Sequence, residues 1–264
     1  MCKTETTELG QVEYSVRGVG TPLVFFHGGH SSCKETVFQK GFDPSRYMLI
    51  TPSRPGYGKT PLLKNTTPRK TADLIERLLG SLGIEKAGVV GISAGGLPAI
   101  EYAARYPGNT TCLILISAVT RKWLDQNDEL YRRGMKMFSP KRENLSWKLF
   151  RTFFRLFPNT MTKTLFNELS TVKDPSFTSG EIEQIKEMTF RQASGTGFVA
   201  DLNHSLRAKT IQNVRCPTLI LHSENDKSVP LEMAYYAEES IENSILKTYK
   251  NKWGHLLWVG EDSK

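Results

Sequence analysis

Short apolar runs recur through the first 117 residues, and each is bounded by turn-forming residues. Runs of this kind are typical of strands that are buried on both faces of a sheet. They predict strands over residues 22–26, 47–52, 87–90 and 112–117. Residues 11–17 alternate weakly between apolar and polar side chains, which predicts an earlier antiparallel strand.

Helical periodicity appears between these strands. The apolar residues from Leu74 to Leu82 fall on one side of a helix over 71–82, and a second helix is predicted over 96–106. Further along, a strand over 216–222, a helix over 230–239 and a strand over 245–249 continue the alternation. Alternating strands and helices are typical of a parallel sheet with right-handed crossovers. The sequence therefore predicts the α/β class, with a mostly parallel, doubly wound sheet.

The alternation breaks between residues 118 and 199, where the chain is helical, aromatic and basic. We therefore predict a core domain over 1–117 and 200–264, and a helical cap (lid) inserted over 118–199. Within the cap, Phe150, Phe153, Phe154 and Phe157 share one side of a helix. We expect this aromatic side to cover an apolar pocket, although Lys148, Arg151 and Arg155 beside it also fit peripheral contact with a membrane surface.

Charge is concentrated in the same segment. The chain of 264 residues has a net charge of +8, and residues 121–163 contain eleven Lys and Arg against four acidic residues. No recognised nucleic-acid motif accompanies them, so we do not expect nucleic acid as a partner.

No apolar run reaches the roughly 20 residues that a bilayer span needs, and the first residues lack the apolar stretch of a secretory signal. Four widely spaced cysteines lack metal-ligand spacing, and Cys112 and Cys216 lie in or beside apolar runs. These features predict a cytoplasmic protein in a reducing compartment.

The strand ending at Val90 leads into Gly91-Ile92-Ser93-Ala94-Gly95 and then into a helix. A serine on a sharp strand-to-helix turn is the arrangement that exposes a nucleophilic hydroxyl. Because a serine hydroxyl is a weak nucleophile near neutral pH, it needs a histidine base and a carboxylate that orients the histidine.

Among the five histidines, His255 follows the last strand and Gly254, so we predict it as the base. Asp226 follows the strand over 216–222, and we predict it as the acid, with Glu224 as the alternative. His30 could line the pocket, and Asp201 is expected to brace the end of the insertion.

Acyl transfer also needs two N–H donors for the oxyanion. The amide of Ala94 begins the helix after the serine, and the second donor should come from His27-Gly28-Gly29 after the strand over 22–26. We predict Gly29, with Gly28 as the alternative.

These motifs together resemble the α/β-hydrolase superfamily, and within it the small, esterase-like serine hydrolases with a helical cap. The matching residues are His27-Gly28-Gly29, Arg54-Pro55-Gly56-Tyr57-Gly58, Gly91-Ile92-Ser93-Ala94-Gly95, Asp226 in Asn-Asp-x-x-Val-Pro, and Gly254-His255. They span nearly the whole chain outside the cap. One departure is Ser53, where relatives often have an acidic residue before the Arg-Pro-Gly-Tyr-Gly run.

The expected function is hydrolysis of a carboxylic ester or related acyl bond, through Ser93, Asp226 and His255 and an acyl-enzyme, without a metal or organic cofactor. The expected partner is a small-molecule ester or acyl substrate. Three alternatives keep the same residues: a slow-turnover ligand sensor, a cofactor-free acyltransferase or perhydrolase, and a hydrolase of carbon–carbon bonds. Dehalogenases and epoxide hydrolases are disfavoured because those relatives have aspartate where this chain has Ser93.

Overall fold

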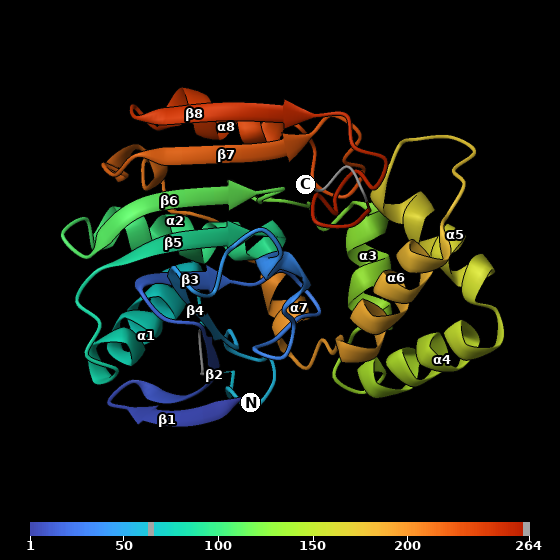
Figure 1. Cartoon of the computed structure of the whole chain (residues 1–264), viewed down its shortest axis with the longest axis horizontal. Helices are drawn as coiled ribbons and strands as arrows, with labels where there is room; N and C mark the ends of the chain where they lie inside the picture. The colour runs from blue at the N-terminus through green and yellow to red at the C-terminus, as the bar shows by residue number, and fades with distance from the viewer. Residues whose placement is uncertain (63–65, 261–264) are drawn as a thin grey trace.

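A sheet of eight strands, in the order β1-β2-β4-β3-β5-β6-β7-β8, forms the centre of the molecule (Figure 1). The computed structural model describes residues 1–62 and 66–260. The strands are β1 (Lys3–Thr7), β2 (Gly10–Arg17), β3 (Thr21–Phe26), β4 (Tyr47–Pro52), β5 (Ala87–Ile92), β6 (Thr110–Ile116), β7 (Thr218–Ser223) and β8 (Ser244–Tyr249). Strand pairs from β4 to β8 are parallel, whereas β2 pairs antiparallel with β1 and with β4. The predicted class, a mostly parallel α/β sheet, is confirmed.

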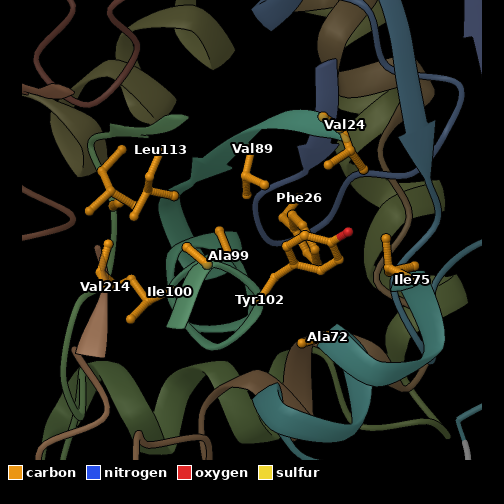
Figure 2. Packing of buried hydrophobic residues seen from close by; sticks show 14 of the residues in the cluster. Val24, Phe26, Ala72, Ile75, Val89, Ala99, Ile100, Tyr102, Leu113 and Val214 are labelled. Carbon is orange, nitrogen blue, oxygen red and sulfur yellow. The ribbon is translucent and has the colours of Figure 1, made fainter. Parts of the chain in front are cut away.

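The apolar runs became strands because they supply side chains to both faces of the sheet. In β3, Val24 and Phe26 pack in a large core cluster on one face, while Leu23 and Phe25 belong to a second cluster on the other. Figure 2 shows Val24 and Phe26 with Tyr102 in the first cluster. Strand β1 was not predicted, because its residues are polar and it is formed only by pairing with β2.

Three helices complete the first core: α1 (Pro68–Ser81), α2 (Gly96–Arg105) and α8 (Glu232–Ser240). The other face of the sheet packs against Phe38 of the short helix η1 (Val37–Gln39), together with Phe42, Leu257 and Trp258. The helices predicted over 71–82, 96–106 and 230–239 are therefore present, with ends that differ by a few residues.

Between β6 and β7 the chain forms helices rather than strands. They are α3 (Glu129–Met137), α4 (Glu143–Leu156), α5 (Pro158–Leu169), α6 (Ser179–Arg191) and α7 (Gly197–Asp201), followed by the short helix η3 (Ile211–Asn213). Figure 1 shows α3 to α6 beyond the carboxyl ends of β5 to β8. None of the helices within residues 1–62 and 66–260 combines the length and apolarity needed to cross a bilayer. The division at residues 117 and 200 stays a prediction.

The expectation for the four cap phenylalanines is wrong for two of them. Phe154 is fully buried, whereas Phe153 and Phe157 are largely exposed. The buried side of α4 is centred on Trp147 and Phe154. Phe153, one residue before Phe154, lies about 100° away from it around the helix and outside this buried side. Four residues at spacings of three and four span a wider arc than the cap covers.

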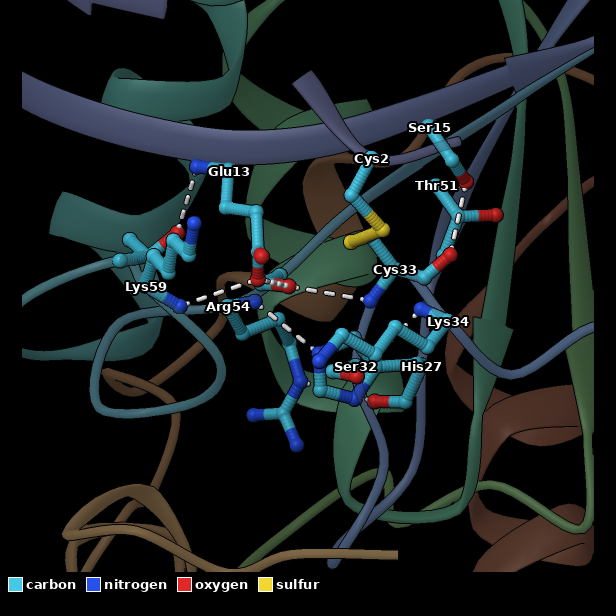
Figure 3. The surroundings of a disulfide bond; sticks show 12 residues. Cys2, Glu13, Ser15, His27, Ser32, Cys33, Lys34, Thr51, Arg54 and Lys59 are labelled. Atoms are coloured by element: carbon cyan, nitrogen blue, oxygen red, sulfur yellow. Dashed lines mark hydrogen bonds between the residues drawn. A yellow bond between two sulfur atoms is a disulfide. The ribbon is translucent and has the colours of Figure 1, made fainter. Parts of the chain in front are cut away.

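A disulfide that the sequence did not predict joins Cys2, before β1, to Cys33, in the loop that follows β3 (Figure 3). The two residues are 31 positions apart in the chain; the β1–β2 pairing places Cys2 beside β2, and hydrogen bonds to Ser15 and Ser53 hold Cys33 there. Nearby, the Ser53 hydroxyl donates to the buried carboxylate of Glu13, so Glu13 supplies an acid next to position 53. Among the described residues, Cys2, Glu13 and Cys33 also lie close enough together to hold a metal ion, but the two sulfurs are bonded to each other in the disulfide. Disulfides are uncommon in a reducing compartment, whereas Cys112 and Cys216 are free as expected, and the cytoplasmic location stays a prediction.

We expect reduction of the disulfide to lower stability, because an open chain gains entropy when unfolded. The Cys2→Ser variant should lose about 2–4 kcal/mol of unfolding free energy. Urea unfolding with and without a thiol reductant measures the effect, and the reductant should shift the midpoint of the wild type but not that of Cys2→Ser. Equal shifts in both proteins would contradict this role of the bond.

Candidate active site

Ser93 lies on the sharp turn between β5 and α2, in the short helix η2 (Ser93–Gly95). Its φ of 50° is in the left-handed region, which is costly for a residue with a side chain. A Cβ at Gly95 would lie 2.0 Å from the carbonyl oxygen of Phe26, so only glycine fits there. The turn therefore holds the Ser93 hydroxyl above the end of β5, where it is partly exposed.

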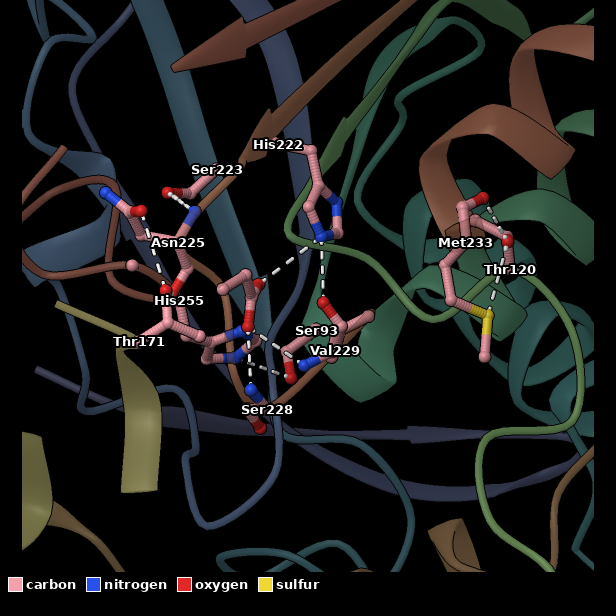
Figure 4. Close-up of polar contacts among 12 residues, drawn as sticks. Ser93, Thr120, Thr171, His222, Ser223, Asn225, Ser228, Val229, Met233 and His255 are labelled. Carbon is pink, nitrogen blue, oxygen red and sulfur yellow. Dashed lines mark hydrogen bonds and ion pairs between the residues drawn. The ribbon is translucent and has the colours of Figure 1, made fainter. Parts of the chain in front are cut away.

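The structure brings Ser93, His255 and Asp226 together from three distant parts of the chain. Figure 4 labels Ser93 and His255 at this contact. The His255 Nε2 is 3.1 Å from the Ser93 Oγ, and the His255 Nδ1 is 2.8 Å from the Asp226 Oδ2. Both distances are those of hydrogen bonds. A histidine that donates from Nδ1 to a carboxylate leaves Nε2 free to accept the serine proton.

Contacts other than the one with His255 hold the Asp226 carboxylate in place. Its Oδ1 accepts hydrogen bonds from the amides of Ser228 and Val229, both at 2.9 Å. The alternative acid, Glu224, is exposed and contacts Thr248 and Lys250 instead. Of the two candidate acids, Asp226 is therefore the one that contacts His255.

The cap holds both loops in place, which sequence reasoning missed. At the end of α5, the Leu169 carbonyl accepts from the amides of Lys227 and His255, at 3.3 and 3.0 Å. Ser170 forms an isolated β-bridge with Asp226. These are backbone contacts, so no residue type in the sequence could have indicated them.

The loop after β3 approaches the serine from the other side. A Cβ on Gly28 would lie 3.1 Å from the Ser93 Cβ, and one on Gly29 would lie 3.0 Å from the Phe198 ring. Ala94, the residue after Ser93, is buried at the start of the turn. The structure thus places Gly28 beside Ser93 and Gly29, the next residue, against Phe198, and the role of the Gly29 and Ala94 amides stays a prediction.

A buried arginine fixes this loop. The Arg54 guanidinium donates to the carbonyls of His27, at 2.7 Å, and Gly28, at 3.2 Å, and binds both oxygens of Asp201 at 2.7 Å. The Tyr57 hydroxyl donates to the same carboxylate. Asp201, expected to cap or brace the end of the insertion, is the last residue of α7 and pairs with Arg54, which the sequence indicates only as part of a turn.

Burial around Arg54 shifts the pKa values of Asp201 and His27. Burial, the largest single effect, would raise the pKa of the Asp201 carboxyl, but the charge of Arg54 and the hydrogen bonds from His204 and Arg54 together hold that pKa below its ordinary value. For His27, burial and then the Arg54 charge lower the pKa to about 3. His27 is therefore neutral, which its hydrogen bonds require: Nε2 accepts from the Arg54 amide and Nδ1 donates to the Gly28 carbonyl.

His30 lies beyond the loop in an aromatic cluster of the cap. Its ring centre is 3.9 Å from that of Phe198 and 4.4 Å from that of Phe138. Its Nδ1 is 2.6 Å from the Ser194 Oγ, which also accepts from the Trp147 indole N–H. An apolar, aromatic wall therefore adjoins Gly29.

We expect acid to destabilise the protein through His27. Above pH 6.5 neither the folded nor the unfolded state protonates this residue, whereas below it the unfolded state binds a proton that the folded state excludes until the pKa of about 3. The contribution of His27 should therefore fall by about 1.4 kcal/mol per pH unit below 6.5. Urea unfolding at several pH values measures this slope, which should be shallower for His27→Gln; equal slopes would contradict the assignment.

Comparison with known proteins agrees with this architecture. Residues 21–259 match the family described as alpha/beta hydrolase fold. An uncharacterized hydrolase of Bacillus subtilis, YcgS, is 37% identical over 99% of this chain and 94% of its own. Among solved structures, an alpha/beta hydrolase fold protein from Nakamurella multipartita has a TM-score of 0.81 at 23% identity, covering 100% of this chain and 95% of that one. An esterase from Exiguobacterium antarcticum has a TM-score of 0.70 at 19% identity, covering 98% and 94%. From its sequence and its fold, the chain belongs to the α/β hydrolase fold family.

Proposed function

We propose that the protein is a serine hydrolase that cleaves an apolar carboxylic ester. The observation that carries the proposal is the hydrogen-bonded chain from Ser93 Oγ through His255 to Asp226. Ser93 attacks the ester carbonyl while His255 takes its proton, and Asp226 stabilises the resulting imidazolium. His255 then returns the proton to the leaving alcohol, and a water that it deprotonates hydrolyses the acyl-enzyme.

The oxyanion that forms in each step is held by the amides of Gly29 and Ala94. Support comes from the position of the glycine loop beside Ser93 and from the bonds between Arg54 and two carbonyls of that loop. A donor that is fixed before the reaction stabilises developing charge without reorganising. Arg54 is thus a positioning residue that acts through the loop.

The choice of an apolar ester rests on the surroundings of Gly29. Phe198 lies against this residue, and Phe138, His30 and Trp147 extend the same surface. The guanidinium of Arg54 is buried and paired with Asp201, so it cannot bind the carboxylate of an acidic substrate. An uncharged acyl or alkoxy group fits this wall best.

The direct test is the Ser93→Ala variant with a short p-nitrophenyl ester. We expect kcat/KM to fall at least about a thousandfold, because the nucleophile is lost. His255→Ala should cost a similar factor, and the double variant no more than either, since the residues act as a unit. Ser81→Ala, on α1 and with its hydroxyl bonded locally to the Leu78 carbonyl, is the control and should keep full activity.

Equal activity of Ser93→Ala and the wild type would end the proposal. A fluorophosphonate that labels Ser93 within seconds, combined with turnover slower than minutes for every ester tried, would favour the ligand sensor instead.

A second experiment tests the positioning role of Arg54. Asp201→Asn leaves a buried guanidinium without its counter-charge, a change that costs about 3–5 kcal/mol when a buried pair is broken outright. We expect a lower melting temperature for the variant. At assay temperatures where the variant is still folded, its kcat should be at least about tenfold lower than that of the wild type, with KM little changed.

The matched control is Asp73→Asn, which breaks the partly exposed pair with Arg105 on the core helices. Its kcat should stay unchanged. An Asp201→Asn enzyme that melts earlier but keeps full kcat would reduce the pair to a purely structural role.

A further inference from the structure

Helix α4 exposes an apolar ridge on the side that faces away from the rest of the cap. Its four members are spaced by four, four and three residues and are between 48% and 63% exposed: Leu145, Leu149, Phe153 and Leu156. The opposite side of the helix is also apolar, and there Trp147 and Phe154 are buried. A helix on a protein surface ordinarily turns charged and polar residues outward, so this ridge is unusual.

Positive charge borders the ridge. Lys148 and Arg155 lie along one side of it, and Lys141 and Arg142 stand at its amino-terminal end, all exposed. The acid of α4, Glu143, is buried and accepts hydrogen bonds from the amides of Ser194 and Gly195. The exposed charged side chains of α4 are therefore all cationic, and they lie beside exposed leucine and phenylalanine.

We propose that the α4 ridge docks on the surface of an anionic lipid membrane. Helices that lie in a membrane interface bury an apolar side at the boundary of headgroups and acyl chains and direct basic residues to the lipid phosphates. Leu145, Leu149 and Leu156 supply the apolar side, and Lys148 and Arg155 lie within reach of the headgroups. The proposal concerns binding alone and holds whichever reaction the site performs.

Charge decides between this partner and a second copy of the chain. A symmetric dimer through the ridge would place Lys148 and Arg155 of one copy near the same residues of the other. Like charges brought together in an apolar contact repel, and α4 exposes no acid to pair with them. An anionic bilayer supplies the opposite charge along the whole ridge.

The position of α4 leaves the ridge accessible. Figure 1 shows α4 at the margin of the cap, away from the sheet. Its inner side holds Trp147 against Ser194 and His30, in the aromatic wall beside Gly29. Docking would therefore bring the candidate active site to the membrane surface without covering β5 or α2.

The test is co-sedimentation of the full chain with vesicles of phosphatidylcholine alone, or with about 30% phosphatidylglycerol, at about 0.1 M salt. We expect binding to the anionic vesicles that is at least about tenfold tighter than to the neutral ones. Leu149→Ser combined with Phe153→Ser should weaken it at least about tenfold, and so should Lys148→Glu combined with Arg155→Glu. The matched control is Ile245→Ser, on the edge strand β8 with 63% exposure, which should bind like the wild type.

All the substituted side chains are exposed, so the variants should fold, and circular dichroism with a melting curve verifies this. A wild type that does not bind the anionic vesicles, or binding that survives both double variants, would overturn the proposal. A dimer in sedimentation velocity that Leu149→Ser with Phe153→Ser abolishes would assign the ridge to a second copy instead and would equally overturn it.

Discussion

The buried ion pair between Arg54 and Asp201 is the interaction on which the site depends. Two charges removed from water are tolerated only when each is fully paired. Here Asp201 occupies one side of the guanidinium, and the carbonyls of His27 and Gly28 occupy the other. One side chain thus joins the loop after β4, the glycine loop after β3 and the end of α7. Because the loss of any of these contacts would leave the buried Arg54 charge less fully compensated, the pair holds the glycine loop beside Ser93.

The cap takes part in the site as well as covering it. Leu169 and Ser170 contact the loops of Asp226 and His255 through the backbone, and Phe198 lies against Gly29. The loops that carry the acid and the base are therefore aligned partly by residues outside the sheet. Movement of α5 relative to the core would change the position of His255, the proposed base, because the Leu169 carbonyl accepts from the His255 amide.

Helix α4 shows how one element serves two environments. Its inner residues, Trp147 and Phe154, pack in the cap and support the aromatic wall near His30. Its outer residues, Leu149 and Phe153 among them, remain in water beside basic side chains. The proposed membrane contact would give the outer apolar residues a partner, as the cap does for the inner ones.

By itself, the sequence determined the sheet, the turn at Ser93 and the candidates Asp226 and His255, because these depend on local signals. Continuous apolar runs of strand length between turn residues are typical of central strands, glycines at 91 and 95 mark a crowded turn, and parallel strands bring their carboxyl ends to one edge. The tertiary structure alone decided the choice between Asp226 and Glu224, the pairing of Cys2 with Cys33, the partner of Asp201 and the contacts of Leu169. It also decided which phenylalanines of α4 face inward. Each of these depends on the direction of a side chain or on a backbone contact between distant segments, and periodicity along one helix or strand contains no information about what lies on either side of it.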